Sequence, residues 1–131
     1  MKKTSFKPGL VVWADLTVPK ADALREFYEA VVGWKARPVD MGGYTDHAMT
    51  PMGHRKPVAG ICHAHGENSD LPPHWLVYIT VANLSRSLRA CSARGGKILV
   101  GPRGMLPHSR YAVIQDPAGA VAALVQPPHP R

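Results

Sequence analysis

An internal repeat constrains the fold of this chain more than any other feature of its sequence. A shift of 63 residues places Thr17 on Thr80 and Gly33 on Gly96. Self-similarity over a fixed interval indicates a duplicated structural unit. Because two copies at this long interval are too few for a solenoid, they predict one pseudo-symmetric domain.

The two copies have the same expected order of elements. In the first, an alternating strand at 10–18 precedes a helix at 21–32. That helix has the spacing of one buried face, with apolar residues at Leu24, Phe27, Tyr28, Val31 and Val32. In the second copy, a strand at 74–81 precedes a helix at 84–94, which Gly95 and Gly96 end. Further strands are expected at 34–39, 44–49, 58–65, 97–100, 110–115 and 120–126.

The boundaries of the repeat follow from turn-forming composition. We expect one domain over 1–131, since 131 residues suffice for a single core. The first module covers about 10–66, a Gly- and Pro-containing linker covers 66–73, the second module covers about 74–126, and a tail covers 127–131. A segment with Gly and Pro at 101–109 is interpreted as a long loop that could cover a cavity mouth.

Charge and composition exclude several classes of partner. The net charge of +7 suits an anionic ligand or nucleic acid, but no helix carries a basic stripe interleaved with aromatics. We therefore expect no nucleic-acid partner. No apolar run approaches the roughly 20 residues that cross a bilayer, so no membrane partner is expected. Cys62 and Cys91 lack metal-finger spacing, and as free thiols they favour the cytoplasm.

Several motifs, taken together and in order, resemble one known family. The first half contains Trp13-x-Asp15-Leu16-x-Val18 and Gly33-Trp34, and the second contains Pro73-His74-Trp75 and Asp116-Pro117-x-Gly119. Over about residues 10–126 the chain resembles the vicinal oxygen chelate superfamily of glyoxalase I, bleomycin-resistance proteins and extradiol dioxygenases. The resemblance implies an α+β fold in which two βαβββ modules in tandem form a curved mixed sheet around a cavity. It also implies a homodimer.

The resemblance places the usual metal-ligand positions on unsuitable residues. Metal-dependent members take ligands from their first and last strands, and three of the four usual positions fall on Trp13, Leu76 and Ala123. The fourth falls in the expected strand at 58–65, where its match is ambiguous by one residue. An indole has an N–H donor and no lone pair for a metal, and Leu and Ala offer no donor atom. Zinc or iron needs three or more N, O or S ligands. We therefore expect no metal and no other cofactor.

The histidines support an alternative interpretation. Five of the seven lie between His47 and His74. His63 and His65 are two apart on an expected strand, so they should share a face and could chelate a metal. His47, His54 or Asp15 could complete such a relocated site. The competing interpretation is that these are histidines of strand ends and loops.

Alternation along the strands predicts the lining of the cavity. One wall should carry Trp13, Asp15 and Thr17, the pseudo-symmetric wall Leu76, Tyr78 and Thr80, and the last strand Val121, Ala123 and Val125. These residues make an aromatic, mostly apolar pocket with one carboxylate. In the alternative, Trp13 and Tyr78 fill the space completely, and Asp15 is satisfied by Thr80, Tyr78 or backbone.

The resemblance and this lining together imply two functions. The first is a metal-independent small-molecule-binding protein of the glyoxalase/bleomycin-resistance type that holds an aromatic or cationic organic ligand in an apolar cavity. The second is a small lyase, isomerase or dioxygenase-like enzyme that uses Asp15 as a base or a relocated histidine metal site. A role in nucleic-acid binding ranks third, because only the net charge supports it.

Overall fold

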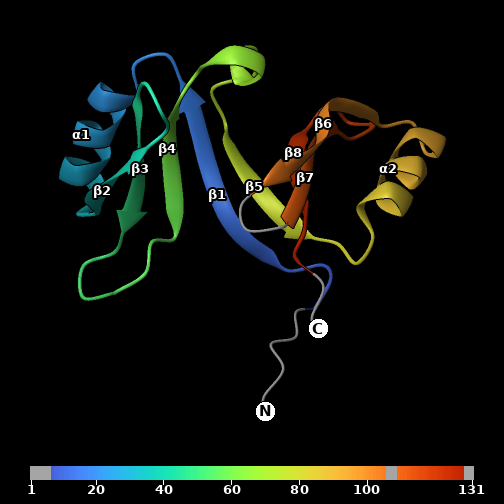
Figure 1. Cartoon of the computed structure of the whole chain (residues 1–131), viewed down its shortest axis with the longest axis horizontal. Coiled ribbons are helices and arrows are strands. Elements are labelled where there is room, and N and C mark those ends of the chain that lie inside the picture. The colour runs from blue at the N-terminus through green and yellow to red at the C-terminus, as the bar shows by residue number, and fades with distance from the viewer. Residues whose placement is uncertain (1–6, 106–108, 129–131) are drawn as a thin grey trace. The chain divides into compact units, whose positions relative to one another are not determined.

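The structure is a computed structural model that describes residues 7–105 and 109–128 (Figure 1). Its helices and strands follow the order expected of a doubled unit, in which one strand, one helix and three strands occur twice. They are β1 (Val11–Val18), α1 (Ala21–Val32), β2 (Lys35–Asp40), β3 (Thr45–Thr50), β4 (Ala59–His63), the 3-10 turn Gly66–Asn68, β5 (Trp75–Thr80), α2 (Leu84–Ala93), β6 (Lys97–Met105), β7 (Ser109–Gln115) and β8 (Val121–Gln126).

The chain divides into two compact units. The first module comprises residues 13–76, and the second module comprises residues 77–128 together with 7–12. In the first, the strand order is β2-β3-β4-β1, and β1 runs parallel to β4. In the second, the order is β6-β7-β8-β5, and β5 runs parallel to β8. The other pairs are antiparallel. The expected α+β class with two βαβββ modules is confirmed.

The core of the first module lies between its sheet and α1. Leu16 and Val18 of β1 are buried there with Met49 and Ile61, as the alternation of β1 predicts. The aromatic rings of Tyr28, Trp34 and Trp75 extend this core. The ring centroid of Tyr28 lies 5.9 Å from that of Trp34 and 5.3 Å from that of Trp75. The Trp75 indole donates a 3.0 Å hydrogen bond to the Tyr28 hydroxyl.

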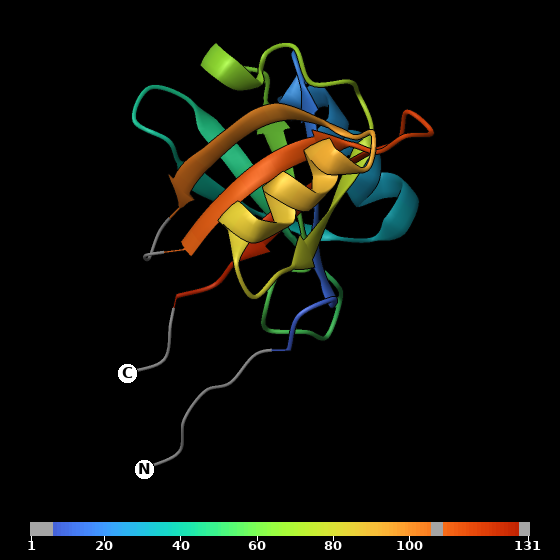
Figure 2. The same cartoon turned by 90° about the vertical axis from the view of Figure 1, so that its right-hand side faces the viewer.

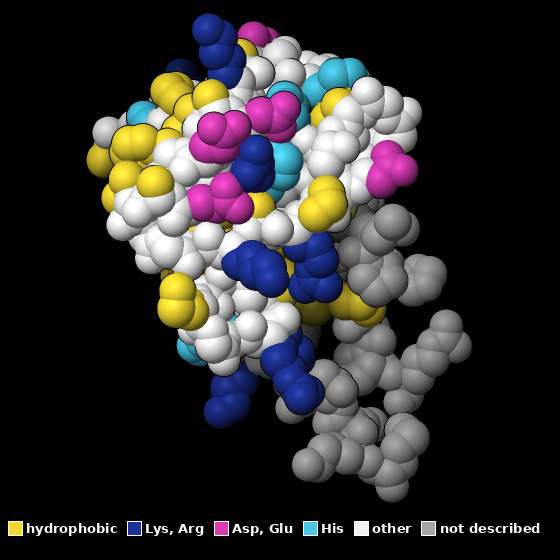
Figure 3. All heavy atoms as spheres, turned by 90° about the vertical axis from the view of Figure 1, so that its left-hand side faces the viewer, with side chains coloured by type: hydrophobic (Ala, Val, Ile, Leu, Met, Phe, Trp, Pro, Cys, Tyr) yellow, Lys and Arg dark blue, Asp and Glu magenta, His cyan; other side chains and the backbone are white. Residues whose placement is uncertain are grey.

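Helix α1 has the predicted length but buries a narrower face than its sequence indicates. Gly33 ends it in the left-handed conformation at φ 84°, and its N–H bonds the carbonyl of Glu29. The expected apolar face is only partly buried, because Phe27, Val31 and Val32 are each more than half exposed. Figure 3 looks onto the face of the molecule on the α1 side, where hydrophobic, acidic and histidine side chains all reach the surface.

Helix α2 begins with a side-chain cap. The Asn83 carboxamide accepts a 2.9 Å hydrogen bond from the Arg86 amide, which satisfies one orphan donor of the first turn. Leu84 and Leu88 of the helix are buried. They pack with Ala112 of β7 and Leu124 of β8. Figure 2 shows α2 lying across the strands of the second module.

The prediction of a long loop at 101–109 was wrong for residues 101–105. Strand β6 continues to Met105 and pairs with β7 as far as Met105 opposite Ser109. Two register shifts, between Ile98 and Val100 and between Val100 and Arg103, accommodate the glycine and proline. Strand β6 is an edge strand, which tolerates proline because its outer N–H groups need no partner. Residues 106–108 lie outside the described residues.

The other expected strands agree with the structure to within a few residues. The largest difference is at β4, which ends at His63 rather than at residue 65. No helix in the described part of the chain is long and apolar enough to span a bilayer.

Candidate functional site

Strand β1 presents three predicted site residues on the side of the sheet that faces away from α1. Trp13, Asp15 and Thr17 are half-buried, whereas their neighbours Leu16 and Val18 pack beneath the helix. The two groups lie on opposite sides because successive side chains of a strand point to opposite faces of the sheet. A large aromatic ring, a carboxylate and a hydroxyl therefore line one strip of this face.

Trp13 and Asp15 form a direct pair. The Trp13 indole Nε1 donates a hydrogen bond of 2.5 Å to Asp15 Oδ1. The expected alternative, in which Asp15 is satisfied by Thr80, Tyr78 or backbone, did not include Trp13 as a partner. This hydrogen bond places the indole ring directly beside the carboxylate.

Gly60 is a site residue that the sequence did not indicate. It lies opposite Asp15 in the register of β1 and β4. A Cβ atom at position 60 would overlap Asp15 Oδ1 and would come within 3.5 Å of Trp13 Cζ2. The absent side chain is therefore what lets the Trp13–Asp15 pair lie flat over β4. A glycine inside a strand was the only available signal, since it often marks a close approach of another group.

Cys62 adds an unreactive thiol to the same face. It follows Gly60 by two residues on β4 and lies opposite Thr17. Burial raises the pKa of the Cys62 thiol well above its ordinary value, and the charges of Asp15 and Asp46 raise it further. The thiol is therefore protonated near neutral pH and is neither a nucleophile nor a ready metal ligand.

Because the Cys62 thiol is protonated, we expect it to react slowly with alkylating reagents. In folded protein at pH 8, iodoacetamide should alkylate Cys62 at least about 100-fold more slowly than in protein unfolded by guanidinium chloride, because the thiolate fraction falls about tenfold for each unit by which the pKa rises. Peptide mass spectrometry over time measures the rate, with Cys91 as the internal comparison. Equal rates in folded and unfolded protein would contradict the protonated state.

A hollow beside Asp15 brings a further predicted residue to this face. Asp15, Thr17 and Leu76 line it together with the preceding segment, which contributes Leu71, Pro72 and His74. Its space is about 10 Å³, close to that needed by one water molecule. Of the predicted site, the structure thus brings together the β1 residues and Leu76. An organic ligand would have to lie across the Trp13 face rather than enter this hollow.

The remaining predicted residues belong to the second module. Tyr78 and Ala123 are buried register partners on β5 and β8. The Thr80 hydroxyl is engaged by backbone, because it donates to the Lys7 carbonyl at 2.7 Å and accepts from the Leu10 amide at 3.0 Å. Thr80 therefore anchors the segment before β1, a role that the sequence did not indicate.

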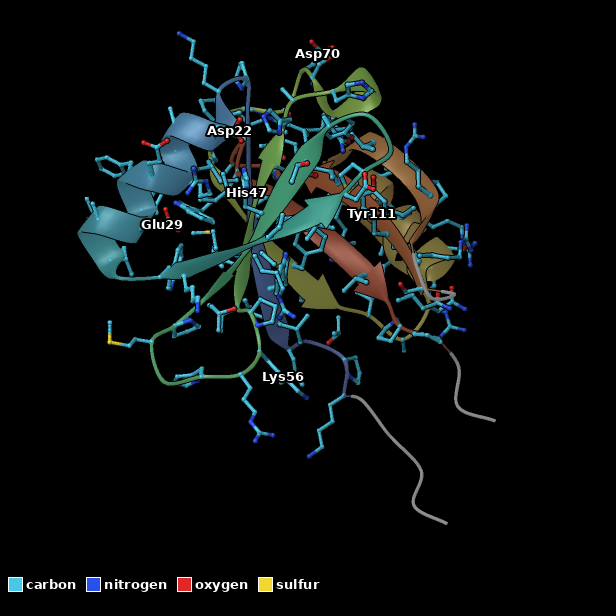
Figure 4. All side chains as sticks on the ribbon, turned by 60° about the vertical axis from the view of Figure 1, so that its left-hand side comes forward. Asp22, Glu29, His47, Lys56, Asp70 and Tyr111 are labelled. Carbon is cyan, nitrogen blue, oxygen red and sulfur yellow. The ribbon has the colours of Figure 1, made fainter. Side chains whose placement is uncertain are left out.

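A histidine–aspartate cluster lies on the α1 side of the first module. Figure 4 shows Asp22, in the first turn of α1, beside His47 of β3. His47 Nε2 is 2.8 Å from Asp22 Oδ1, and His63 Nε2 is 3.8 Å from the same oxygen. The hydrogen bond with His47 lowers the pKa of Asp22; desolvation opposes this effect, and the charge of His63 adds to the lowering.

The two histidines of the alternative metal site contact an aromatic ring. His65 stacks on Tyr44 with ring centroids 4.4 Å apart, and His63 meets the edge of the same ring at 5.9 Å. His63 Nδ1 is buried without a hydrogen-bond partner, and its nearest acidic atom is Asp46 Oδ1 at 3.5 Å. Among the described residues, no group of three or more His, Cys, Asp or Glu side chains is arranged to hold a metal ion.

A match to a family model identifies the family of this chain. Residues 10–124 match the model of the Glyoxalase/Bleomycin resistance protein/Dioxygenase superfamily. The chain belongs to this superfamily. The fold implied by the sequence motifs is therefore the fold of its family, and the matched range covers the whole first module and most of the second.

The superfamily relatives identified by sequence are longer proteins. The chain is 31% identical over 132 residues to the anthracycline biosynthesis protein DnrV of Streptomyces peucetius, covering 92% of this chain and 48% of that protein. It is 28% identical over 119 residues to the putative glyoxylase CFP32 of Mycobacterium tuberculosis, covering 91% of this chain and 44% of that protein. The chain thus spans about half the length of the curated relatives it matches.

A solved structure supports the glyoxalase-superfamily fold. The methylmalonyl-CoA epimerase of Streptomyces coelicolor, in complex with 2-nitronate-propionyl-CoA, superimposes with a TM-score of 0.58 at 17% identity. The alignment covers 92% of this chain and 95% of the epimerase chain. At this identity the similarity establishes the fold alone.

The residues at the metal-ligand positions that the resemblance implies do not fit a metal. These positions carry Trp13, Leu76 and Ala123, none of which has a lone pair for a metal. The Trp13 N–H is already directed at Asp15 Oδ1, and Ala123 is fully buried.

Proposed function

We propose that the protein binds a flat aromatic or cationic organic molecule, without a metal, on the face of the first module that carries Trp13 and Asp15. The observation that supports this most directly is the Trp13–Asp15 hydrogen bond laid over Gly60. It holds an aromatic ring and a negative charge side by side. Such a pair suits a ligand that stacks on the indole and carries positive charge beside the ring.

Two further features support binding rather than chemistry on this face. The Cys62 thiol is held protonated, so it supplies no nucleophile. The resemblance implies that Trp13, Leu76 and Ala123 occupy metal-ligand positions, and these side chains would hold no Lewis acid there. The proposal also agrees with the name of one relative, DnrV, since anthracyclines are flat polycyclic aromatic compounds.

We further propose that the protein acts as a cytoplasmic homodimer. Phe27, Val31 and Val32 expose apolar surface on α1, and exposed apolar patches often mark protein–protein contacts. Cys62 and Cys91 are free thiols, as is usual in a reducing compartment. Sedimentation velocity at micromolar concentration should give the mass of two chains; a monomer at these concentrations would contradict this part of the proposal.

The binding test compares a charged ligand with an uncharged counterpart. Proflavine is a flat cation at pH 7.5, whereas acridine has the same ring system and is mostly neutral. By isothermal titration calorimetry, Trp13→Ala should weaken binding of both compounds at least about tenfold, which corresponds to about 1.4 kcal/mol. Asp15→Asn should weaken proflavine binding and spare acridine, while leaving the circular dichroism spectrum unchanged.

Met52→Ala is the control, because Met52 is an exposed hydrophobic residue of the same module and lies outside the α1 surface proposed for the dimer. It should leave both affinities unchanged. If Trp13→Ala instead left ligand affinity intact and caused a large loss of stability, Trp13 would be a plain core residue. If Asp15→Asn bound proflavine as tightly as the parent protein, the polar anchor would not be Asp15.

A further inference from the structure

A second and larger cavity lies in the second module, between α2 and the sheet. Its space is about 510 Å³, within the range of small-molecule sites. Val81, Ile114 and Leu124 line it from the sheet side, and Ala90 and Cys91 line it from α2. It lies on the helix side of the sheet and in a different module from the Trp13–Asp15 pair.

The internal repeat explains why this cavity exists. The same shift of 63 residues that relates the two modules places Leu24 on Ser87 and Tyr28 on Cys91. In the first module Leu24 and Tyr28 pack against the core beneath α1. In the second module their counterparts are the smaller side chains of Ser87 and Cys91, and both line the cavity. The cavity is therefore the space that larger side chains fill in the first module.

The sheet side of the cavity has not been reduced in the same way. Val81 corresponds to Val18, and Leu124 corresponds to Ile61. Each pair is similar in size, and all four side chains pack beneath the helix of their own module. Among the residues that line the cavity, Ser87 and Cys91 of the helix are smaller than their counterparts in the first module. Ala112 of the sheet is also smaller than its counterpart Met49, but it packs with Leu84 and Leu88. An apolar ligand surface placed in this space would be removed from water, which favours binding.

The rim of the cavity carries one cation and one carboxylate, Arg94 and Asp116. Arg94 lies at the end of α2 and forms no ion pair with a described residue. The one carboxylate at the rim, Asp116, has its Oδ1 occupied by the amides of Ala118 at 2.8 Å and Ala120 at 3.0 Å. Arg94 is therefore the side chain at this rim best placed to attract a charged group, and it selects an anion.

We infer that this cavity is a binding site for a small molecule that combines an aromatic ring with an anionic group such as a carboxylate or sulfonate. The ring occupies the space that Leu24 and Tyr28 fill in the first module, and the anion lies beside Arg94. The site is independent of the function proposed for the first module, because the two share no residue.

Two naphthalene probes test the inference. 8-Anilinonaphthalene-1-sulfonate has the required ring and anion, and N-phenyl-1-naphthylamine is its uncharged counterpart. Fluorescence titration should show one site per chain for the sulfonate. Cys91→Phe and Ser87→Leu, which fill the cavity from α2, should each weaken the sulfonate at least tenfold. Arg94→Gln should weaken the sulfonate several-fold and leave the uncharged probe unchanged.

Ser92→Leu is the control, because Ser92 is exposed on the same helix and the change also adds an apolar side chain. It should leave binding of both probes unchanged, as should Trp13→Ala in the other module. Thermal unfolding checks that the filled variants are folded. Equal affinity in the parent, Cys91→Phe and Ser87→Leu proteins would overturn the inference, and so would equal loss in Ser92→Leu.

A second measurement needs no variant. Because Cys91 lines the cavity, saturating sulfonate probe should slow alkylation of Cys91 by iodoacetamide at least fivefold in the native protein. An unchanged rate would overturn the inference. If the filled variants changed the sedimenting mass of the protein and the probe gave no protection, the occupant would be a second copy of the chain, and the inference would be wrong.

Discussion

Replacing Tyr28 with alanine should lower the free energy of unfolding by about 3 kcal/mol, the lower end of the range for removing a large aromatic side chain from a core. The ring is half-buried, but it joins Trp34 and Trp75 into one cluster and its hydroxyl accepts the hydrogen bond from the Trp75 indole. Its removal leaves a cavity and a half-buried N–H donor without this partner.

Urea denaturation followed by circular dichroism measures this change. Tyr28→Phe separates the two contributions, since it keeps the ring and should cost only about 1 kcal/mol for the lost hydrogen bond. Cys91→Ala changes the counterpart of Tyr28 in the repeat, where a cavity already exists, and should cost less than about 1 kcal/mol. A similar loss at both positions would show that the aromatic cluster does not dominate the packing of α1.

Replacing Gly60 with alanine should weaken proflavine binding at least about tenfold, or about 1.4 kcal/mol, with little change in stability. The new Cβ would occupy the position of Asp15 Oδ1. The carboxylate is the flexible end of a side chain, so it can rotate away at small cost. That rotation breaks the hydrogen bond from Trp13 and separates the ring from the charge. Calorimetric titration of proflavine measures the affinity.

Gly43→Ala is the matched control for this change. A Cβ at position 43 would meet no atom within 4 Å, and Gly43 has no positive φ. It lies in the same module, so it reports any general effect of adding a methyl group. If Gly60→Ala bound proflavine as well as Gly43→Ala does, the pairing of Trp13 with Asp15 would not be what the ligand recognises.

The sequence allowed prediction of the elements because their periods are local. Alternation along β1 separated Leu16 and Val18, which lie beneath α1, from the residues on the other face. Repeat spacing likewise located both helices. The aromatic contribution of Trp75 to the core of the first module was not predicted, because it depends on contacts with Tyr28 and Trp34, which lie more than 40 residues earlier in the chain.

The parts of the site that escaped prediction depend on strand register. Gly60 lies beneath Asp15 only because β1 and β4 pair in one alignment, and no local pattern specifies that alignment. The extension of β6 was missed for a related reason. Glycine and proline indicate a loop when they are considered locally, but an edge strand with register shifts accommodates both.

The segment that precedes β1 also bears on how such a chain can be recombined. Residues 7–12 pack with the second module, where the Gly9 amide donates to the Thr80 carbonyl at 2.7 Å and the Thr80 amide donates to the Leu10 carbonyl at 2.9 Å. The repeat in the sequence and the compact units of the structure are therefore offset. An exchange of the second copy between related proteins, by a gene fusion or by design, would have to carry residues 7–12 with it.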